Sequence, residues 1–362
     1  MKLAILGTRG IPARYGGFET FAEELSTRLV ERGHEVTVYC EKGGHSAPDS
    51  YHGVRLEYVS APSFGPLSIV WFDTLCMVKA ARSHDVLYLL GYGAGAFVWL
   101  PRLLGAPVWV NMDGLEWKRS KWPWYGRWYL RFNEWCATRF SSGMIADAVG
   151  IESYLRQKHG PQNRIEMIPY GAGIIEFSPD PGLLDSFQLS PQGYYLVVCR
   201  LEPENHVAEI VEGFNNAGTA RDLVIVGNSD SESHYVRELK KKSGDRVRYV
   251  GVCYEKTKLT ALRYHAYAYF HGHSVGGTNP SLLEALGCGN IVIAHDNVFN
   301  REVTGEAGFY FMKSGDIPQL LDRIENMGDV LREKWSARAR QLIRDRYTWD
   351  RVTEKYLQIF HD

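Results

Sequence analysis

The sequence predicts an α/β protein with two domains, each built on a parallel sheet. Short apolar runs alternate with segments whose apolar residues recur at helical spacing, as in a doubly wound sheet. The alternation fails between residues 171 and 193, where prolines and glycines accumulate, and then restarts. A chain of 362 residues also exceeds one average core. We therefore expect domains at 1–172 and 173–345, followed by a helical segment at 346–362.

The first half opens with an expected strand at 2–6, a glycine-containing loop and a helix at 18–31. This helix carries its apolar residues on one face, so it should pack on the sheet. Because ligands of such sheets bind beyond the carboxyl ends of the strands, residues that follow strands are candidates for function. The other elements expected here are strands at 35–40, 55–59, 85–90, 107–110, 143–146 and 164–168, and a helix near 69–81.

The second half repeats this organisation after the segment 171–193, which we interpret as an interdomain linker. Five apolar runs predict a second parallel sheet, and three helices of mixed charge close the sequence. The expected strands are 194–199, 222–226, 246–250, 267–270 and 291–294, and the expected final helices are 317–327, 331–346 and 349–360.

Composition and charge argue against several classes of protein. A net charge of −1 lacks the basic excess of a general nucleic-acid binder. The six cysteines are scattered singly, which favours reduced thiols over disulfides or a zinc site. The apolar run at the start is too short for a signal peptide, and the uncharged stretch 86–101 is shorter than the ~20 residues that span a bilayer. We expect a cytoplasmic protein.

Residues 276–289 form the most informative pattern in the chain. Glycines, Asn279 and Pro280 separate an apolar strand from a helix, so the free amides of the turn and the helix dipole can bind an anion. Glu284, about one turn further on, can accept hydrogen bonds from a sugar hydroxyl. The pattern predicts a nucleotide diphosphate site, although an ordinary strand-to-helix connection with a surface glutamate would look the same.

Two further segments favour an anion site. The loop 7–20 follows the first strand and opens the first helix, and its glycines allow backbone amides to approach a phosphate. A surface connection is the alternative. The apolar strand at 194–199 leads into Arg200, whose guanidinium could stabilise a leaving diphosphate by about 3 kcal/mol. The alternative for Arg200 is a surface ion pair with Glu202 or Glu204.

Two carboxylates follow the strand at 107–110. Asp113 and Glu116 should reach the same sheet edge, where they could orient or deprotonate an acceptor hydroxyl. An aspartate before a glycine is also common in turns.

The segment 117–135 holds half of the ten tryptophans, interleaved with cations. Trp with Lys or Arg suits the boundary between lipid headgroups and acyl chains, so the segment predicts a membrane-surface or lipid-acceptor contact. Aromatic packing inside the domain and stacking on single-stranded nucleic acid are alternatives. The residues assigned to this contact are Glu116, Trp117, Lys118, Arg119, Lys121, Trp122, Trp124, Arg127 and Trp128.

Two other motifs are weaker. Residues 91–96 match the dinucleotide-binding fingerprint and indicate NAD when taken alone, but they lie in a late strand–helix unit and leave the other sites unexplained. His271 and His273 have no Glu or Cys to complete a metal site. The chain has no Asp-x-Asp pair to hold a metal diphosphate, so we expect amides and arginine to meet the leaving-group charge without a metal.

Together these segments resemble retaining glycosyltransferases of family 4. The resemblance rests on Gly16 and Gly17, on 32–38 and 168–171, and on Arg200 with 284–289, and it spans nearly the whole chain. Residues 111–117 and 273–281 resemble more narrowly a bacterial rhamnosyltransferase branch with an N-terminal region of the domain-of-unknown-function 1972 type. Members of this branch use dTDP-L-rhamnose to extend lipid-linked polysaccharide precursors.

The resemblance implies the GT-B architecture, in which two facing Rossmann-like domains enclose a cleft. It implies that the acceptor binds the first domain, that the nucleotide sugar binds mainly the second, and that the final helix packs back on the first. Asp113 falls where many members carry a catalytic histidine. The resemblance assigns Glu284 to the ribose, Arg200 to the diphosphate, Gly277, Thr278, Asn279 and Ser281 to the phosphates and donor sugar, and Gly16 and Gly17 to the phosphates from the other domain.

The sequence departs from the family pattern at two positions. The family usually has a glutamate where this chain has Gly276, and a lysine where it has Asn205. The missing contacts must come from elsewhere, and His273, Asn279 and Arg9 are the candidates. The narrower branch shares the glycine, so we interpret it as a change of donor rather than a loss of activity.

The sequence therefore predicts a retaining, metal-independent glycosyltransferase without a cofactor, with Asp113, Arg200 and Glu284 as catalytic residues. It would move a 6-deoxyhexose, first of all L-rhamnose from dTDP-rhamnose, to a lipid-linked saccharide in bacterial surface polysaccharide synthesis. We expect it in the cytoplasm, peripheral on the inner face of the plasma membrane, without nucleic-acid partners. The alternatives are a related enzyme using another UDP- or GDP-sugar, an NAD-dependent sugar-nucleotide oxidoreductase, and a non-catalytic nucleotide-sugar binder.

Overall fold

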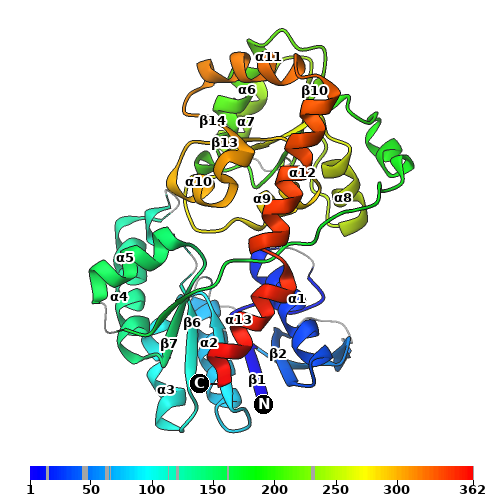
Figure 1. Cartoon of the computed structure of the whole chain (residues 1–362). Helices are drawn as coiled ribbons and strands as arrows, with labels where there is room; N and C mark the ends of the chain where they lie inside the picture. Colours follow the sequence, from blue (N-terminus) through cyan, green and yellow to red (C-terminus); the bar gives the residue numbers. More distant parts are fainter. Residues whose placement is uncertain are drawn as a thin grey trace. The chain divides into compact units, whose positions relative to one another are not determined.

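The computed structural model divides the chain into two compact units (Figure 1). The N-terminal unit comprises Met1–Tyr170 and Trp349–Asp362, and the C-terminal unit comprises Gly171–Thr348. The structure describes residues 1–13, 16–42, 48–61, 65, 67–112, 114–119, 122–160, 163–229 and 233–361. The first unit thus ends two residues before the expected boundary at 172, and the chain returns to it at Trp349.

The N-terminal unit contains an eight-stranded sheet in the order β3-β4-β2-β1-β5-β6-β7-β8. All neighbours pair in parallel except β3 and β4. The central strands are buried along their length, as expected of a parallel sheet covered on both faces. The strands are β1 (Lys2–Leu6), β2 (Glu35–Glu41), β3 (Ser50–Tyr51), β4 (Val54–Val59), β5 (Val86–Leu90), β6 (Val108–Asn111), β7 (Gly143–Ala146) and β8 (Ile165–Met167).

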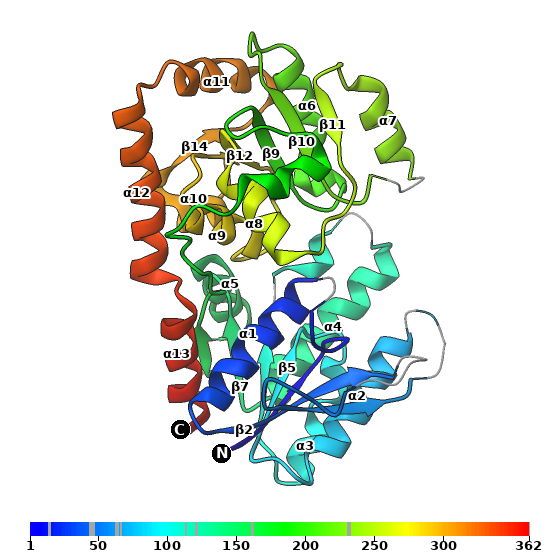
Figure 2. The same ribbon diagram turned by 90° about the vertical axis from the view of Figure 1, so that its right-hand side faces the viewer.

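Helices cover both faces of this sheet (Figure 2). α1 and α13 pack together through Phe21, whose ring lies 5.9 Å from that of Trp349 and 5.6 Å from that of Tyr356. The Tyr356 hydroxyl lies 2.8 Å from that of Tyr88 in β5, so the last helix belongs to the core of the N-terminal unit. The helices are α1 (Gly17–Glu31), α2 (Leu67–Ala80), α3 (Trp99–Leu103), α4 (Trp124–Phe140), α5 (Val149–His159) and α13 (Trp349–His361), with short 3₁₀ turns η1 (Gly95–Phe97) and η2 (Glu116–Lys118).

The C-terminal unit contains a six-stranded parallel sheet in the order β11-β10-β9-β12-β13-β14. β9 lies in the middle and pairs with β10 and β12, which places the ends of these strands at one sheet edge. β14 was not expected from the sequence. The strands are β9 (Tyr194–Val198), β10 (Asp222–Val226), β11 (Val247–Tyr249), β12 (Ala268–His271), β13 (Val292–His295) and β14 (Gly308–Phe311).

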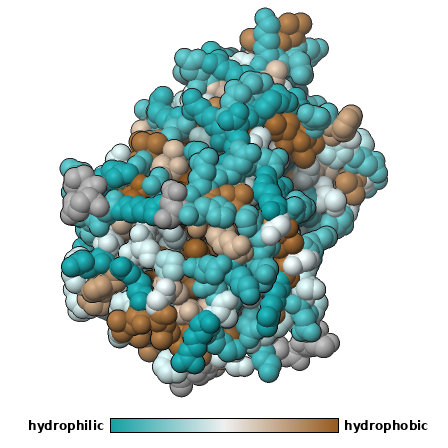
Figure 3. Space-filling view, turned by 60° about the horizontal axis from the view of Figure 1, so that its bottom comes forward, coloured by the Kyte–Doolittle hydropathy of each residue, from teal (hydrophilic) through white to brown (hydrophobic). Residues whose placement is uncertain are grey.

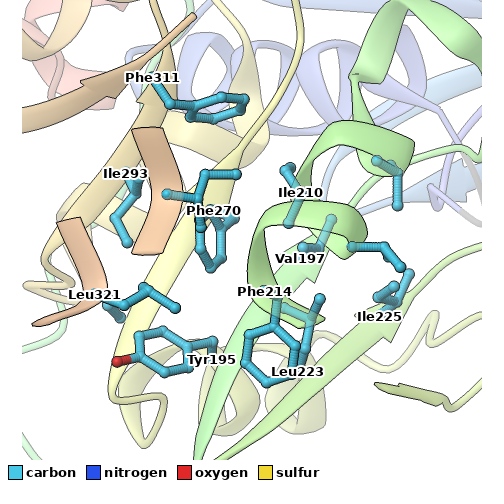
Figure 4. Close-up of a cluster of buried hydrophobic side chains, with 14 of the residues drawn as sticks. Tyr195, Val197, Ile210, Phe214, Leu223, Ile225, Phe270, Ile293, Phe311 and Leu321 are labelled. Atoms are coloured by element: carbon cyan, nitrogen blue, oxygen red, sulfur yellow. The ribbon is translucent and has the colours of Figure 1, made fainter. Parts of the chain in front are cut away.

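The core of the C-terminal unit lies between this sheet and its helices (Figure 4). Tyr195, Phe214, Phe270 and Ile293 are almost fully buried there. The helices are α6 (Val207–Asn215), α7 (His234–Lys242), α8 (Lys256–Tyr264), α9 (Pro280–Gly287), α10 (Val298–Thr304), α11 (Ile317–Glu325) and α12 (Asp329–Arg346), with 3₁₀ turns η3 (Pro181–Phe187), η4 (Pro203–Asn205), η5 (Gly305–Ala307) and η6 (Ser314–Asp316).

The segment interpreted as a linker, 171–193, is part of the C-terminal unit. The Ile175 amide donates to the Gly287 carbonyl at 3.0 Å, and a Cβ on Gly287 would lie 2.1 Å from the Gly173 oxygen. The chain therefore packs directly against α9. Its prolines and glycines shape a surface segment, including η3 with Asp180 as its cap, and they do not mark a free connection.

Candidate functional site

Two loops of the C-terminal unit leave the same sheet edge. Arg200 follows β9 and His273 follows the neighbouring β12. α9 begins beside the end of β9, because the Ser281 hydroxyl donates to the carbonyl of Val198 at 3.2 Å. The arginine, the histidine and the start of α9 therefore lie at the carboxyl edge of one parallel sheet, where ligands of such folds bind.

The side chain of Arg200 is 43% exposed. Its Nη1 lies 3.8 Å from Oε1 of Glu202, which is too long for a hydrogen bond and typical of a weak surface pair. The ion pair considered from the sequence is thus present only as a loose contact. The guanidinium remains accessible to an anionic ligand.

Asn205, at the position where the family usually has lysine, is buried and joins the two loops. Its Nδ2 donates to the Arg200 carbonyl at 2.7 Å, and its Oδ1 lies 2.8 Å from Nδ1 of His273. Because the amide nitrogen is used on Arg200, its oxygen faces the imidazole, and His273 donates from Nδ1. Asn205 therefore positions both residues, a role that sequence reasoning missed.

The backbone at Gly276, where the family usually has a glutamate, has a conformation that disfavours a side chain. Gly276 adopts a φ of +124°, which L-residues rarely adopt, and a Cβ would lie 3.3 Å from Nε2 of His273. The imidazole thus lies next to the place where a side chain would begin. His273 is therefore a polar side chain next to this position, and its contact with the donor sugar stays a prediction.

The start of α9 is capped by its own residues. Asn279 is the N-cap, and its Oδ1 accepts from the Ser281 amide at 2.9 Å. The Leu282 and Leu283 amides donate to the Asn279 carbonyl. Thr278, just before the cap, is buried. The donor contacts assigned to Gly277, Thr278 and Asn279 stay predictions.

Ser281 is held inside the unit. Besides Val198, its hydroxyl lies 2.6 Å from the Tyr269 hydroxyl and accepts from Nη2 of Arg263 at 3.2 Å. The hydroxyl therefore has hydrogen-bond partners within the unit, and the donor contact assigned to Ser281 stays a prediction.

Arg263 of α8 also holds the predicted ribose-binding carboxylate. Its Nη2 lies 2.6 Å from Oε2 of Glu284, and the two side chains are 5% and 37% exposed. Burial is the largest influence on the pKa of Arg263 and lowers it, but the Glu284 carboxylate, Tyr269 and Cys288 together outweigh burial, so the net shift is upward. Sequence reasoning missed Arg263, because an arginine in a polar helix resembles a surface residue until the packing is known.

Histidines surround this edge of the sheet. Burial, followed by the charge of His273, lowers the pKa of His271 to about 3, so this side chain is neutral. The rings of His206 and His295 stack at 3.9 Å with planes 10° apart. Within the described ranges, no group of three or more His, Cys, Asp or Glu side chains is arranged to hold a metal ion.

In the N-terminal unit, two glutamate side chains accept hydrogen bonds from backbone amides of the glycine-containing loop. The Arg9 amide donates to Oε1 of Glu19 at 3.2 Å, and the Ala13 amide to Oε2 of Glu23 at 2.6 Å. A Cβ on Gly16 would lie 2.0 Å from the Glu19 carboxylate. Carboxylates thus lie where the sequence predicted a bound phosphate, and the donor contacts of Arg9, Gly16 and Gly17 stay predictions.

The acceptor candidates divide into a packed group and an exposed group. Asp113 and Lys121 lie outside the described residues. Glu116 pairs with Arg119 at 2.9 Å and accepts from the Trp122 indole at 3.0 Å. Trp117 packs beside α4, and Lys118 is exposed with its Nζ 5.5 Å from the Trp117 ring.

Trp117 is fixed by a buried carboxylate. Its indole donates to Glu134 at 3.0 Å, and the Arg131 guanidinium lies 4.1 Å from its ring. Burial raises the pKa of Glu134, but hydrogen bonds from His159 and Lys158 outweigh it and lower the pKa. By contrast, Trp124, Arg127 and Trp128 extend from α4 into solvent.

The segment 91–96 packs against α4 and opens a short 3₁₀ turn in place of a helix. A Cβ on Gly95 would lie 2.3 Å from the Asn133 carbonyl, and the Tyr129 hydroxyl donates to the Gly93 carbonyl at 2.9 Å. Gly95 therefore allows close packing against α4, which is a structural reason for a glycine in this segment that needs no NAD.

None of the helices in the described part of the chain has the length and apolar character needed to cross a bilayer.

Comparison with known proteins supports a two-part chain. Residues 1–173 match the family described as domain of unknown function DUF1972, and residues 186–342 match the family described as glycosyl transferases group 1. No curated protein matches the chain.

Several solved structures share the fold over almost the whole chain. Sucrose-phosphate synthase from Thermosynechococcus elongatus has a TM-score of 0.83 at 16% identity and covers 99% of this chain and 98% of its own. HepE from Anabaena in complex with UDP-glucose has a TM-score of 0.79 at 16% identity, covering 100% and 99%. A glycosyltransferase from Rickettsia africae has a TM-score of 0.75 at 13% identity, covering 99% and 97%. These likenesses show the GT-B fold.

Proposed function

We propose that this chain, which joins a DUF1972 region to a glycosyltransferase group 1 domain, is a retaining glycosyltransferase whose C-terminal unit binds a nucleotide diphosphate sugar. The arrangement that carries the proposal is the exposed Arg200 guanidinium at the same sheet edge as the Glu284 carboxylate, which buried Arg263 holds in place. A cation and a fixed carboxylate are the groups that a diphosphate and a ribose require.

In the proposed reaction the bond between the anomeric carbon and the diphosphate oxygen breaks, and the acceptor oxygen bonds to the same face of that carbon. Because the new bond forms on the face from which the diphosphate leaves, the configuration is retained, and the acceptor proton passes to the leaving phosphate oxygen. Arg200 stabilises the charge that develops on the diphosphate. Asp113 is the proposed acceptor-side residue, and we propose that no metal takes part.

We propose a 6-deoxyhexose as the transferred sugar, first of all L-rhamnose from dTDP-rhamnose. The support is local: Gly276 provides no carboxylate and the His273 imidazole lies beside it. A site with one carboxylate fewer suits a sugar with fewer hydroxyl groups. A UDP-hexose is the second candidate, because the similar HepE structure contains UDP-glucose.

We propose a lipid-linked saccharide as the acceptor, used in bacterial surface polysaccharide synthesis at the cytoplasmic face of the membrane. The exposed Trp124, Arg127 and Trp128 support this, since such side chains suit a lipid–water boundary.

A panel of nucleotide sugars tests the proposal. Purified protein is incubated with dTDP-rhamnose, UDP-glucose or GDP-mannose, with and without EDTA, and release of nucleotide diphosphate is measured with and without a lipid-linked acceptor. Release that is fastest with dTDP-rhamnose and unaffected by EDTA is expected, with an unchanged anomeric configuration by NMR. Preference for UDP-glucose would support the second donor, and binding without turnover would identify a non-catalytic binder.

A further inference from the structure

The N-terminal unit exposes apolar side chains on α2, α3 and α4, three helices that follow one another in the chain. Leu103 of α3 is 76% exposed and Trp124 of α4 is 81% exposed. Figure 3 views this unit from its lower end in Figure 1 and shows hydrophobic side chains gathered at the surface. We call this surface the α2–α4 face and define it by Leu67, Trp71, Trp99, Leu103, Trp124 and Trp128.

The three helices form one continuous surface. α2 contacts α3, and a pocket of about 660 Å³ between α3 and α4 is lined by Trp99, Leu103, Phe132 and Trp135 among others. Along α4 the rings of Trp128 and Phe132 stack at 5.8 Å, and Trp135 follows at 6.2 Å. Large contiguous apolar patches that are exposed on a protein surface commonly mark a binding surface.

The exposed charges of these helices are all positive. They belong to Lys79, Arg102, Arg127, Arg131 and Arg139; Lys79 is paired with Glu57, and the Arg131 guanidinium lies over the Trp117 ring. The two acidic residues of the same helices are buried: Asp73 is 6% exposed and Glu134 is 1% exposed. A chain with a net charge of −1 thus presents an apolar face together with three exposed arginines on the same helices, Arg102, Arg127 and Arg139.

We infer that the α2–α4 face docks on an anionic lipid bilayer. Its tryptophans and leucines would enter the boundary between headgroups and acyl chains, while the arginines contact lipid phosphates. A second copy of the chain fits less well, because a two-fold contact through this face would bring arginines of both copies together. The inference rests on the proposed function in one respect: a lipid-linked acceptor would be reached at the same surface.

The inference extends the contact well beyond the segment 117–135. The proposed contact surface includes α2 and α3. It leaves out Trp117 and Trp122, because their indoles are hydrogen-bonded to Glu134 and Glu116. The α3–α4 pocket, apolar apart from Arg102, lies within the face.

Vesicle co-sedimentation tests the inference with substitutions in α2 and α3 only. The variant Leu67→Glu/Trp71→Glu/Leu103→Glu is compared with Phe177→Glu/Val298→Glu/Val330→Glu, which changes equally exposed apolar residues of the C-terminal unit. The probes are vesicles of phosphatidylcholine alone and vesicles with equal parts of phosphatidylglycerol. Circular dichroism confirms that both variants are folded.

We expect the wild-type protein to sediment with the anionic vesicles and not with the neutral ones. The α2–α3 variant should lose at least about tenfold in vesicle affinity, since three apolar side chains that would enter the bilayer are replaced by carboxylates, while the control should keep the wild-type affinity. Equal binding by both variants would overturn the inference, as would a wild-type dimer that the α2–α3 variant dissociates. Vesicle binding needs no turnover, so a catalytically inactive protein that sediments normally would contradict the proposed function and leave the inference standing.

Discussion

The guanidinium of Arg263 lies 2.6 Å from the carboxylate of Glu284, and the same guanidinium donates to Ser281. Arg263, which is buried, thus holds two side chains of α9, those of Ser281 and Glu284. The pair is asymmetric, because the arginine is buried and the glutamate is partly exposed. One carboxylate edge can therefore face a ligand while the other is held.

Substitutions at this pair should separate stability from catalysis. Glu284→Gln should lower transfer by about two to three orders of magnitude, and it should also destabilise the fold by about 3 kcal/mol, because it leaves the Arg263 charge unpaired. Adding Arg263→Met should recover much of the stability and none of the transfer. Urea unfolding and initial rates measure both, and rates restored in the double variant would show that Glu284 has no ligand role.

Arg200 should behave differently from Arg263. Because its side chain is exposed and only loosely paired, Arg200→Ala should leave the thermal unfolding midpoint within about a degree. The same change should lower kcat by about two to three orders of magnitude through lost stabilisation of the leaving diphosphate. Arg221→Ala, which removes an arginine paired with Glu325, is the control and should keep full activity. An unaffected rate in Arg200→Ala would exclude Arg200 from the site.

A side chain at Gly276 should be costly. Gly276→Ala must adopt a strained backbone with φ near +124° beside His273, so we expect a loss of about 1–3 kcal/mol in the free energy of unfolding and weaker donor binding. Gly218 has space for a Cβ and no positive φ, so Gly218→Ala is the matched control. Denaturant unfolding and calorimetric titration with a nucleotide sugar compare the two. Wild-type values for Gly276→Ala would show that the loop readily changes conformation.

Asp73 should make stability depend on pH. Burial raises the pKa of this carboxyl to about 7, so the folded protein keeps a proton that the unfolded chain has lost above about pH 4. Stability contributed by the protonated carboxyl is therefore full below about pH 4, declines as pH rises to about 7, and is then constant, a change of up to about 4 kcal/mol.

Asp73→Asn should remove this decline in the free energy of unfolding. The stability of the variant relative to the wild type should therefore be highest at about pH 8 and lowest at about pH 4. The exposed Asp185→Asn is the control. Urea unfolding across this pH range measures the difference, and parallel curves for wild type and Asp73→Asn would contradict the prediction.

Most of the framework follows from local sequence. Unbroken apolar runs such as Tyr194–Val198 predict buried parallel strands, and the spacing of Phe21 and Leu25 predicts the face of α1. The two-residue β3 was beyond such prediction, because its pattern is too short. The segment 171–193 was misinterpreted, because the same prolines and glycines occur in free linkers and in packed surface turns.

The site was predictable only in part. Arg200 and Glu284 could be proposed because one follows an apolar strand and the other lies in the first turns of a helix, and these are positions that sequence order defines. Asn205 and Arg263 were not, since each acts through a partner far along the chain: Asn205 through His273, and Arg263 through Glu284.

By itself, the sequence determined the two α/β units, the loops that follow their strands, and the residue types placed on those loops, because hydrophobic periodicity and turn chemistry act over a few residues. Only the tertiary structure decided which side chains are satisfied from within, as Ser281 and Trp117 are, and which stay exposed, as Arg200 and Trp124 do. The physical reason is that burial and hydrogen bonding depend on neighbours brought together by packing, and those neighbours are distant in the sequence.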